Sequence, residues 1–312
     1  SHKASRFQFG RDIVSPYEEN HRMNSPMTET FTAACVQNCA SLQPKETADR
    51  AEELVREASA KGADLICTPE FFSCLDTQLS GLGTDPHTEE THPALPRFRA
   101  LAEELERWLL LGSITILGDD TDDRLFNRSY LINPSGNIVA RYNKIHLFDI
   151  DIDKKEVYRE PEQFQPGTEA VLAPTPWGLL GMTVCYDVRF PHLYRDLAKA
   201  GAGILTVPSA FTKKTGEAHW HVLLRARAIE AASFVIAPCQ SGTHGIGTTY
   251  GHSLIIDPWG TILADGGGQE EGVVTAEVDL SLIQKARRRI PALKHDRDYV
   301  PPAMPIASAP AE

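Results

Sequence analysis

Short apolar runs that alternate with helical periods are the feature that most limits what this chain can fold into. Residues 31–36 and 64–68 are apolar runs of strand length, and residues 46–61 between them have the period of an amphipathic helix. The same alternation continues along the chain, with helices expected at residues 95–109 and 218–232. Strands that alternate with helices in this way predict a mixed α/β fold.

Two hairpins add antiparallel strands to this alternation. The runs at 126–132 and 138–142 flank an Asn-Pro-Ser-Gly turn, and those at 250–256 and 260–264 flank Asp-Pro-Trp. Residues 143–167 are polar and predict an irregular segment. On the order of ten strands result, and two packed sheets accommodate that number more easily than one.

The chain shows one domain rather than two. No linker interrupts residues 27–312, which are expected to form a single domain with a C-terminal tail. Residues 1–26 are polar and aperiodic, which indicates an expression-derived or disordered leader. A native start at Met23 or Met27 would fit that interpretation.

Charge and cysteine content limit the partners. The net charge of −11 argues against nucleic acid or an anionic membrane, because both favour a basic surface. No apolar run approaches the roughly 20 residues that cross a bilayer. The six cysteines form no C-x-x-C pair, and a chain this long does not need disulfides. We therefore expect reduced thiols in a cytoplasmic protein.

Cys185 stands where a strand turns sharply into a helix. An apolar run over 179–184 ends there, a polar and aromatic turn follows, and Pro191 opens an expected helix at 192–201. This geometry lifts a side chain out of a sheet and exposes it to a pocket, as a nucleophile requires. Taken alone, a buried cysteine is more often a small core residue than a nucleophile.

Two other side chains have unusual surroundings. Glu70 follows a buried strand and precedes two phenylalanines, so partial desolvation would suit it to accept and return a proton. Lys144 precedes an apolar and aromatic stretch, where its charge could stabilise an oxyanion. Either residue could instead be structural, as a helix cap or a surface lysine. On spacing alone Glu156, Glu160 or Glu162 could pair with Lys144.

Together these stretches resemble the nitrilase superfamily of carbon–nitrogen hydrolases. The resemblance rests on the motifs Cys67-Thr-Pro-Glu70, Tyr142-Asn-Lys-Ile-His-Leu-Phe-Asp149 and Val184-Cys-Tyr-Asp-Val-Arg-Phe-Pro191, in matching order and spacing. It covers about residues 31–291. Three unrelated motifs in register are far more specific than any one of them.

The resemblance implies a role for each matching residue. Cys185 would be the nucleophile, Glu70 the general base and Lys144 the cation that faces the tetrahedral intermediate. Glu160 matches the second glutamate of the family, and Asn127 matches a position that supports the catalytic carboxylate. The resemblance also implies a four-layer α-β-β-α sandwich that dimerises through its sheet-covering helices, with no metal or organic cofactor.

The sequence also resembles the Nit branch of this superfamily in the segments 208–212, 215–220, 223–230, 250–253 and 257–260. Members of that branch hydrolyse primary amides of α-keto acids such as deaminated glutathione and related ω-amides. Such a substrate carries carboxylates, so the resemblance implies cations in the pocket. The substrate-binding candidates are Tyr186 (through its backbone N–H), Arg189, Phe211, His219 and Arg225. Each of them could instead be structural: Arg189 could brace the turn through Asp187, and Arg225 could form a buried ion pair.

Two departures from the family pattern leave other functions open. His192 and His221 replace glutamates that are usual in relatives, so negative charge is lost near the expected site. The same triad also serves N-carbamoyl amino acid and aliphatic amide hydrolases, and a catalytically idle scaffold would keep the same fold. Because alternate helix residues point apart, His219 and His221 are not expected to share a metal.

Replacing the predicted nucleophile or base tests this assignment. Cys185→Ala removes the sulfur and Glu70→Gln removes the proton acceptor, so each variant should lose turnover and keep its fold. Kinetics and circular dichroism measure the two properties. Near-normal kcat in either variant would contradict the assignment.

Overall fold

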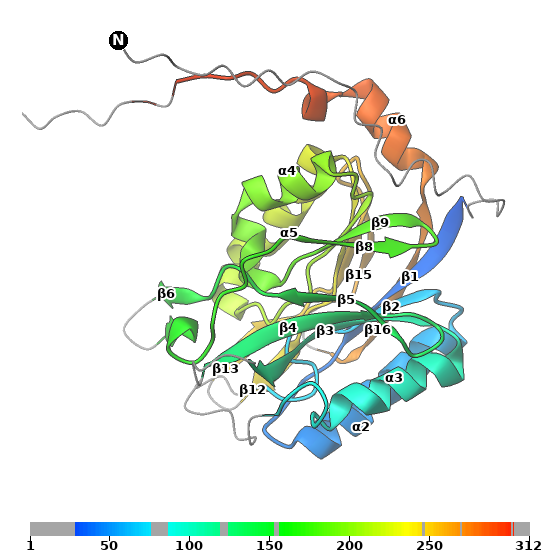
Figure 1. Cartoon of the computed structure of the whole chain (residues 1–312), viewed down its shortest axis with the longest axis vertical. Helices are drawn as coiled ribbons and strands as arrows, with labels where there is room; N and C mark the ends of the chain where they lie inside the picture. Colours follow the sequence, from blue (N-terminus) through cyan, green and yellow to red (C-terminus); the bar gives the residue numbers. More distant parts are fainter. Residues whose placement is uncertain are drawn as a thin grey trace, which may run out of the picture.

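Two six-stranded sheets pack face to face in the computed structural model, with helices on the outer faces (Figure 1). The structure describes residues 29–75, 87–118, 124–152, 156–244, 247–268, 270–300 and 302. The predicted α-β-β-α sandwich is therefore confirmed. The predicted leader lies outside the described residues.

The first sheet and its helices come mainly from the first half of the chain. In spatial order its strands are β16 (Gly272–Asp279), β1 (Thr30–Gln37), β2 (Leu65–Cys67), β3 (Trp108–Leu117), β4 (Leu125–Ile132) and β5 (Ile138–Asn143). Helices α2 (Pro44–Ala60) and α3 (Ala94–Leu105) cover its outer face (Figure 1). Strand β1 is buried on both sides: Ala34 and Val36 pack with the helices, whereas Ala33 and Cys35 join the core between the sheets.

The second sheet has the order β15 (Ile262–Asp265), β14 (Leu254–Ile256), β11 (Phe234–Ala237), β10 (Ile204–Thr206), β9 (Gly178–Met182) and β8 (Val171–Thr175). Helices α4 (Pro191–Lys199) and α5 (Lys213–Ala231) cover it, and α6 (Ser281–Arg289) follows β16 (Figure 1). Trp220 and Leu224 of α5 are fully buried against this sheet. Across the core, the Cys35 thiol donates to the carbonyl of Leu254 at 3.7 Å.

The expected helix at 95–109 ends earlier, at Leu105. Glu106 takes a left-handed conformation with φ 51°, and strand β3 begins at Trp108. The apolar run of β3 contributes to two cores. Leu110 packs in the core between the sheets, whereas Leu109 and Leu111 pack under the helices α2 and α3. A strand buried on both faces has no alternation of polar and apolar residues, so the run extended the helical pattern.

Two other expectations were wrong in detail. Residues 143–167 are not simply irregular, because they contain the hairpin of β6 (Asp149–Asp151) and β7 (Val157–Arg159) and the 3-10 turn Glu160–Glu162. The run at 250–256 is not one strand. Strand β13 (Gly247–Tyr250) pairs with β12 (Ser241–His244), and the positive φ of Gly251 and His252 separates it from β14.

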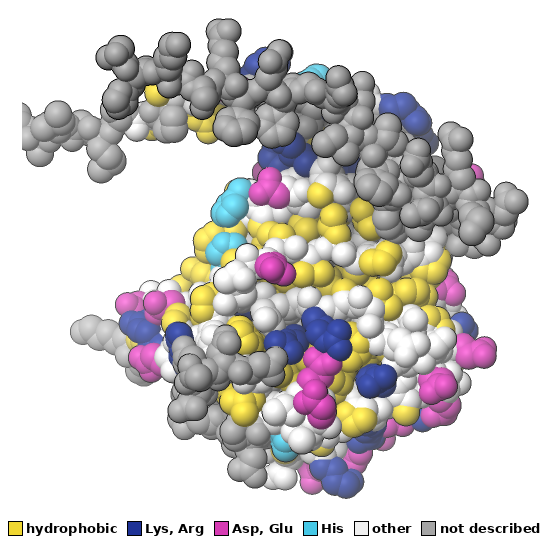
Figure 2. Space-filling model, viewed as in Figure 1, with side chains coloured by type: hydrophobic (Ala, Val, Ile, Leu, Met, Phe, Trp, Pro, Cys, Tyr) yellow, Lys and Arg dark blue, Asp and Glu magenta, His cyan; other side chains and the backbone are white. Residues whose placement is uncertain are grey.

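The surface mixes charges of both signs. In the face shown in Figure 2, basic side chains lie next to acidic ones, and Glu89 accepts hydrogen bonds from Arg141 and Arg128. Within the described part of the chain, no helix has the length and apolar character needed to span a membrane.

A substitution at Gly112 tests how closely the first sheet approaches the loop that carries Glu70. A Cβ atom at Gly112 would lie 2.1 Å from the carbonyl oxygen of Thr68. Gly112→Ala should therefore lower the free energy of unfolding by about 1–3 kcal/mol in urea titrations. Gly272→Ala is the matched control, because nothing lies within 4 Å of its Cβ position. Equal losses in the two variants would contradict this packing.

Candidate active site

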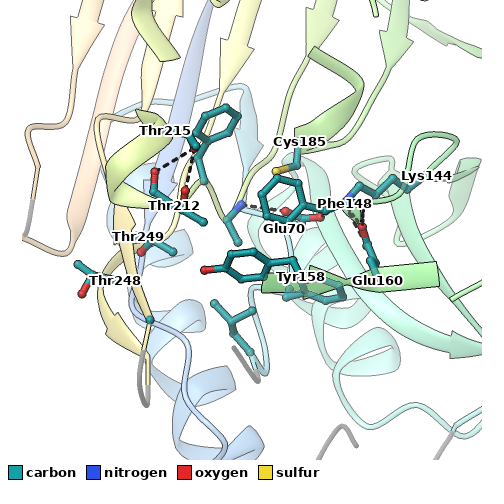
Figure 3. A pocket seen from close by; sticks show the side chains of 15 residues that line it. Glu70, Lys144, Phe148, Tyr158, Glu160, Cys185, Thr212, Thr215, Thr248 and Thr249 are labelled. Carbon is teal, nitrogen blue, oxygen red and sulfur yellow. Dashed lines mark hydrogen bonds and ion pairs between the residues drawn. The ribbon is translucent and has the colours of Figure 1, made fainter. Parts of the chain in front are cut away.

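A single pocket gathers the residues of all three sequence motifs (Figure 3). Its cavity of about 70 Å³ is lined by Glu70, Lys144, Glu160 and Cys185, which each follow the end of a strand. Aromatic side chains and threonines form the rest of the wall, chiefly Phe71, Phe148, Tyr158, Phe211, Thr212, Thr215, Thr248 and Thr249.

Cys185 is held at a strained turn. Strand β9 ends at Met182, and Cys185 opens the 3-10 turn Cys185–Arg189 with φ 48°, a left-handed conformation that side chains rarely adopt. Its backbone N–H donates to the carbonyl of Pro208 at 2.9 Å. The strain and this hydrogen bond fix the direction of the side chain, which is 7% exposed and borders the pocket.

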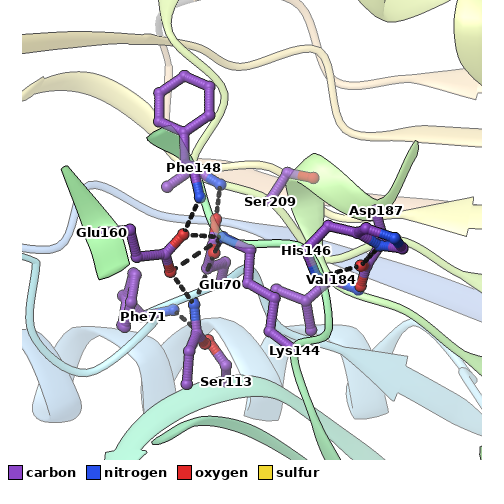
Figure 4. A network of polar contacts seen from close by, with 12 residues as sticks. Glu70, Phe71, Ser113, Lys144, His146, Phe148, Glu160, Val184, Asp187 and Ser209 are labelled. Carbon is purple, nitrogen blue, oxygen red and sulfur yellow. Dashed lines mark hydrogen bonds and ion pairs between the residues drawn. The ribbon is translucent and has the colours of Figure 1, made fainter. Parts of the chain in front are cut away.

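Asp187 joins this turn to the segment that carries Lys144 (Figure 4). Its fully buried carboxylate accepts hydrogen bonds from the Val184 N–H at 2.8 Å and from the Tyr142 hydroxyl at 2.7 Å. It also contacts the backbone N–H of His146 at 3.0 Å and Nδ1 of the same residue at 2.7 Å. Because these partners flank Lys144 and Cys185, Asp187 fixes the two chain segments relative to each other.

The centre of the site is a buried ammonium between two carboxylates (Figure 4). Lys144 Nζ lies 2.8 Å from Glu70 Oε1, and 3.0 Å and 2.8 Å from the two oxygens of Glu160. The three side chains are only 2–3% exposed. Taking such charges out of water is costly unless each is paired and hydrogen-bonded, so the remaining donors decide whether the cluster is stable.

Three further donors complete the cluster. The Asn127 side-chain amide donates to Glu70 at 2.8 Å and to Glu160 at 3.1 Å. The Ala210 N–H donates to Glu70 Oε2 at 2.9 Å, and the Phe148 N–H donates to Glu160 Oε2. Both carboxylates are therefore oriented by neutral donors as well as by the lysine.

Burial and charge determine which of these groups carry protons. Burial raises the pKa of the Cys185 thiol well above its usual value, and the Glu70 carboxylate raises it further, against the opposing charge of Lys144. Burial alone would lower the pKa of Lys144, but the charges of Glu160 and Glu70 outweigh it and raise that pKa. The resting site thus holds a neutral thiol beside a charged ammonium, so attack by sulfur needs a base.

Of the expected substrate-binding residues, Phe211 lines the pocket. Arg189 lies behind it, with its guanidinium 5.3 Å from the Phe211 ring, 5.8 Å from the Tyr186 ring and 3.3 Å from His219 Nδ1. Tyr186 in turn packs edge-on against Phe148, which lines the pocket. These residues contact the wall rather than the cavity. Arg225 lies elsewhere, where it donates to the carbonyl of Gly260 at 2.8 Å.

Sequence reasoning missed several parts of the site. Of the threonines, Thr212 immediately precedes α5, Thr215 lies in α5, and the other two lie on β13. Tyr158 comes from β7. Gln240 supports the loop that carries Glu70, because its side-chain amide donates to the carbonyl of Glu70 at 3.0 Å. Isolated threonines and a glutamine give no signal in a single sequence, whereas Tyr158 stands beside the Glu160 motif and could have been found there.

A buried thiol beside a carboxylate and an ammonium is the arrangement of a thiol-dependent hydrolase. The family model for carbon–nitrogen hydrolases matches residues 32–288. A deaminated glutathione amidase from Dictyostelium discoideum is 38% identical over 255 residues, which are 80% of this chain and 87% of that protein. The chain therefore belongs to the carbon–nitrogen hydrolase family, and the nitrilase-superfamily resemblance is confirmed.

Solved structures agree. The crystal structure of the C. elegans NitFhit protein gives a TM-score of 0.76 at 33% identity, covering 86% of this chain and 65% of that one. A glutamate-to-glutamine mutant of an amidase from Nesterenkonia sp. AN1 gives a TM-score of 0.69 at 25% identity, covering 83% of this chain and 94% of that one, and its active-site cysteine carries the acetamide moiety of fluoroacetamide. The chain is an enzyme of this amidase kind, which acts through a cysteine.

The charge balance around the thiol can be tested by alkylation. In Glu70→Gln, the charge and hydrogen bond that raise the pKa of Cys185 are lost, while Lys144 still lowers it. The pH midpoint of iodoacetamide modification of Cys185 should therefore move to lower pH, even as turnover is lost. Peptide mass spectrometry follows the modification.

The matched control for this experiment is Glu162→Gln, which neutralises an exposed carboxylate two residues after Glu160. Its alkylation midpoint should equal that of the unmodified protein. A midpoint that stays in place or rises in Glu70→Gln would contradict the contact between Glu70 and Cys185.

Proposed function

We propose that this carbon–nitrogen hydrolase cleaves a small carboxylated primary amide, of the deaminated glutathione or ω-amide type, and releases ammonia. The observation that carries the proposal is the contact of Lys144 with both glutamates in the pocket that Cys185 borders. Deaminated glutathione amidases among the relatives support the substrate class.

Glu70 is the proton carrier in this mechanism. It takes the thiol proton as Cys185 Sγ bonds to the amide carbonyl carbon, and it gives that proton to the nitrogen as the C–N bond breaks and ammonia leaves. A thioester remains on Cys185. Glu70 then takes a proton from water, the hydroxide adds to the thioester, and the carboxylic acid departs as the proton returns to sulfur.

Lys144 stabilises the oxyanion of each tetrahedral intermediate, together with the backbone N–H of Tyr186. An ammonium has three N–H groups, and Lys144 lies within hydrogen-bond distance of one oxygen of Glu70 and of both oxygens of Glu160. One N–H shared between the two oxygens of Glu160 leaves a third for substrate. Loss of one such donor typically costs about 3–4 kcal/mol in the transition state. Glu160 and Asn127 are positioning residues, because they contact Lys144 and Glu70.

We propose that four threonines of the pocket wall bind the polar tail of the substrate: Thr212, Thr215, Thr248 and Thr249. Thr212 and Thr215 lie at the start of α5 with their hydroxyls 2.8 Å apart, and Thr248 and Thr249 lie on β13. Hydroxyls and the first amides of a helix favour a carboxylate. Among the described lining residues Lys144 is the one cation, so we propose that threonines contact the tail and that Arg189 acts through Phe211.

An aliphatic amide is the second candidate, because Phe71, Phe148, Tyr158 and Phe211 make much of the wall apolar. An N-carbamoyl amino acid is the further alternative with the same triad.

We also propose a homodimer and a cytoplasmic location. Val222 and Ile229 on α5 are 68% and 49% exposed, which supports pairing of the helices in a dimer. No disulfide joins any of the six cysteines, which supports a reducing location.

A substrate panel decides between these amides. We expect ammonia release from an α-keto acid ω-amide at a kcat/KM well above that for an N-carbamoyl amino acid or a simple aliphatic amide. Intact-protein mass spectrometry should detect the thioester, and Cys185→Ala is the blank. Preference for either competing substrate would contradict the proposed substrate class while leaving the thiol mechanism standing.

Substitution of Thr215 tests whether the threonines of the pocket bind the substrate tail. Thr215→Val keeps the shape and removes one hydroxyl, so it should raise KM for the carboxylated amide several-fold, with a smaller effect on kcat. A neutral amide of the same length is the control, and its KM should stay unchanged. An equal effect on both substrates would contradict the proposed role.

A further inference from the structure

His221, His252 and Asp265 converge at a surface position away from the cavity of the active site. They come from α5, from the segment between β13 and β14, and from the end of β15. His221 Nε2 lies 3.2 Å from Asp265 Oδ2, and His252 Nδ1 lies 2.8 Å from Asp265 Oδ1. One nitrogen or oxygen atom from each of the three residues lies within 4.8 Å of the other two.

The surrounding structure holds these groups in place. His252 has a left-handed φ of 51°, a conformation that a non-glycine residue keeps only when its surroundings require it. Its N–H donates to the Gly267 carbonyl at 2.6 Å, and its ring stacks on Tyr250 with the centroids 4.5 Å apart. The Gly267 N–H in turn donates to Asp265 Oδ1 at 2.9 Å.

We propose that His221, His252 and Asp265 form a binding site for a divalent transition-metal ion of the Zn²⁺ type. Zinc binds imidazole nitrogen and carboxylate oxygen at about 2.0–2.2 Å, so its ligand atoms lie roughly 3–3.5 Å apart. The two contacts with Asp265 have nearly this spacing. A cation would replace the protons that now bridge each imidazole to the carboxylate, with neutral imidazoles as ligands.

The kind and exposure of the ligands select the ion. Two imidazoles and one carboxylate suit Zn²⁺ or Co²⁺, whereas Ca²⁺ and Mg²⁺ prefer sites made of oxygen. The three side chains are 26–35% exposed, which leaves room for an ion to enter and for water to complete its coordination. The Tyr250 hydroxyl lies 3.5 Å from His221 Nδ1, so it can orient that ring from behind.

A bound ion would cross-link α5 to the strands β14 and β15. The site is connected to the active-site wall, because Trp220 donates to the His252 carbonyl at 2.8 Å and packs against Phe211, with the ring centroids 4.9 Å apart. None of the three ligands lines the cavity. The ion would therefore stabilise the fold rather than take part in amide hydrolysis, and its binding does not depend on the proposed substrate.

Metal titration of the purified full-length protein tests the site. After removal of metals with EDTA, isothermal titration with ZnCl₂ should show one saturable site per chain, and saturating Zn²⁺ should raise Tm by several degrees. His221→Ala and Asp265→Asn should each weaken binding at least tenfold and abolish the shift in Tm. His295→Ala, which removes an exposed histidine elsewhere, is the control and should bind as the unmodified protein does.

Titration with Co²⁺ distinguishes metal binding at this site from metal binding to cysteine thiolates. The Co²⁺ complex should show d–d absorption without a thiolate charge-transfer band, since its ligands are nitrogen and oxygen. Circular dichroism verifies that each variant is folded. No saturable binding, binding that survives in both ligand variants, or a thiolate band would each overturn the proposal.

Discussion

The buried ammonium of Lys144 is the interaction on which the rest of the active site depends. One cation and two carboxylates lie out of water at the same point, and each glutamate alone would be costly to bury. Lys144 contacts both, and Asn127 and two backbone N–H groups supply the remaining hydrogen bonds. The fold must therefore bring the ends of strands β2, β5 and β7 to the same place.

A second constraint fixes the sulfur against this charged cluster. Cys185 keeps a left-handed backbone, and the turn that strains it is tied through Asp187 to Tyr142 and His146 on either side of Lys144. The turn that carries Cys185 and the segment that carries Lys144 thus belong to one connected polar network. Burial raises the pKa of the thiol, so attack by the sulfur needs a base, and in the proposed mechanism Glu70 is that base.

The three sequence motifs of the site could be recognised more easily than the residues that form the rest of the pocket. Motifs around Glu70, Lys144 and Cys185 are local, so they can be found without knowing how the chain folds. The alternation of strands and helices likewise indicated two sheets. The strand boundary at Trp108 was missed because β3 is buried on both faces and lacks a polar alternation.

Features that depend on tertiary contacts were beyond the sequence. The threonines of the pocket wall come from the start of α5 and from β13, and these elements meet where Tyr250 packs against Gly216 and its N–H donates to the Phe211 carbonyl at 2.8 Å. In the same way, His221 was weighed as a ligand only beside His219, since the fold was needed to bring Asp265 to it. Spacing along a chain predicts neighbours on one helix and not those on a distant strand.

The most direct test of the central claim is a crystal structure of Cys185→Ser with a bound α-keto acid ω-amide. The account predicts the carbonyl carbon about 3–3.5 Å from the hydroxyl that replaces Sγ, and the carbonyl oxygen about 2.7–3.1 Å from Lys144 Nζ. An amide bound with its carbonyl oxygen directed away from Lys144, or with its carbon out of reach of that hydroxyl, would contradict it.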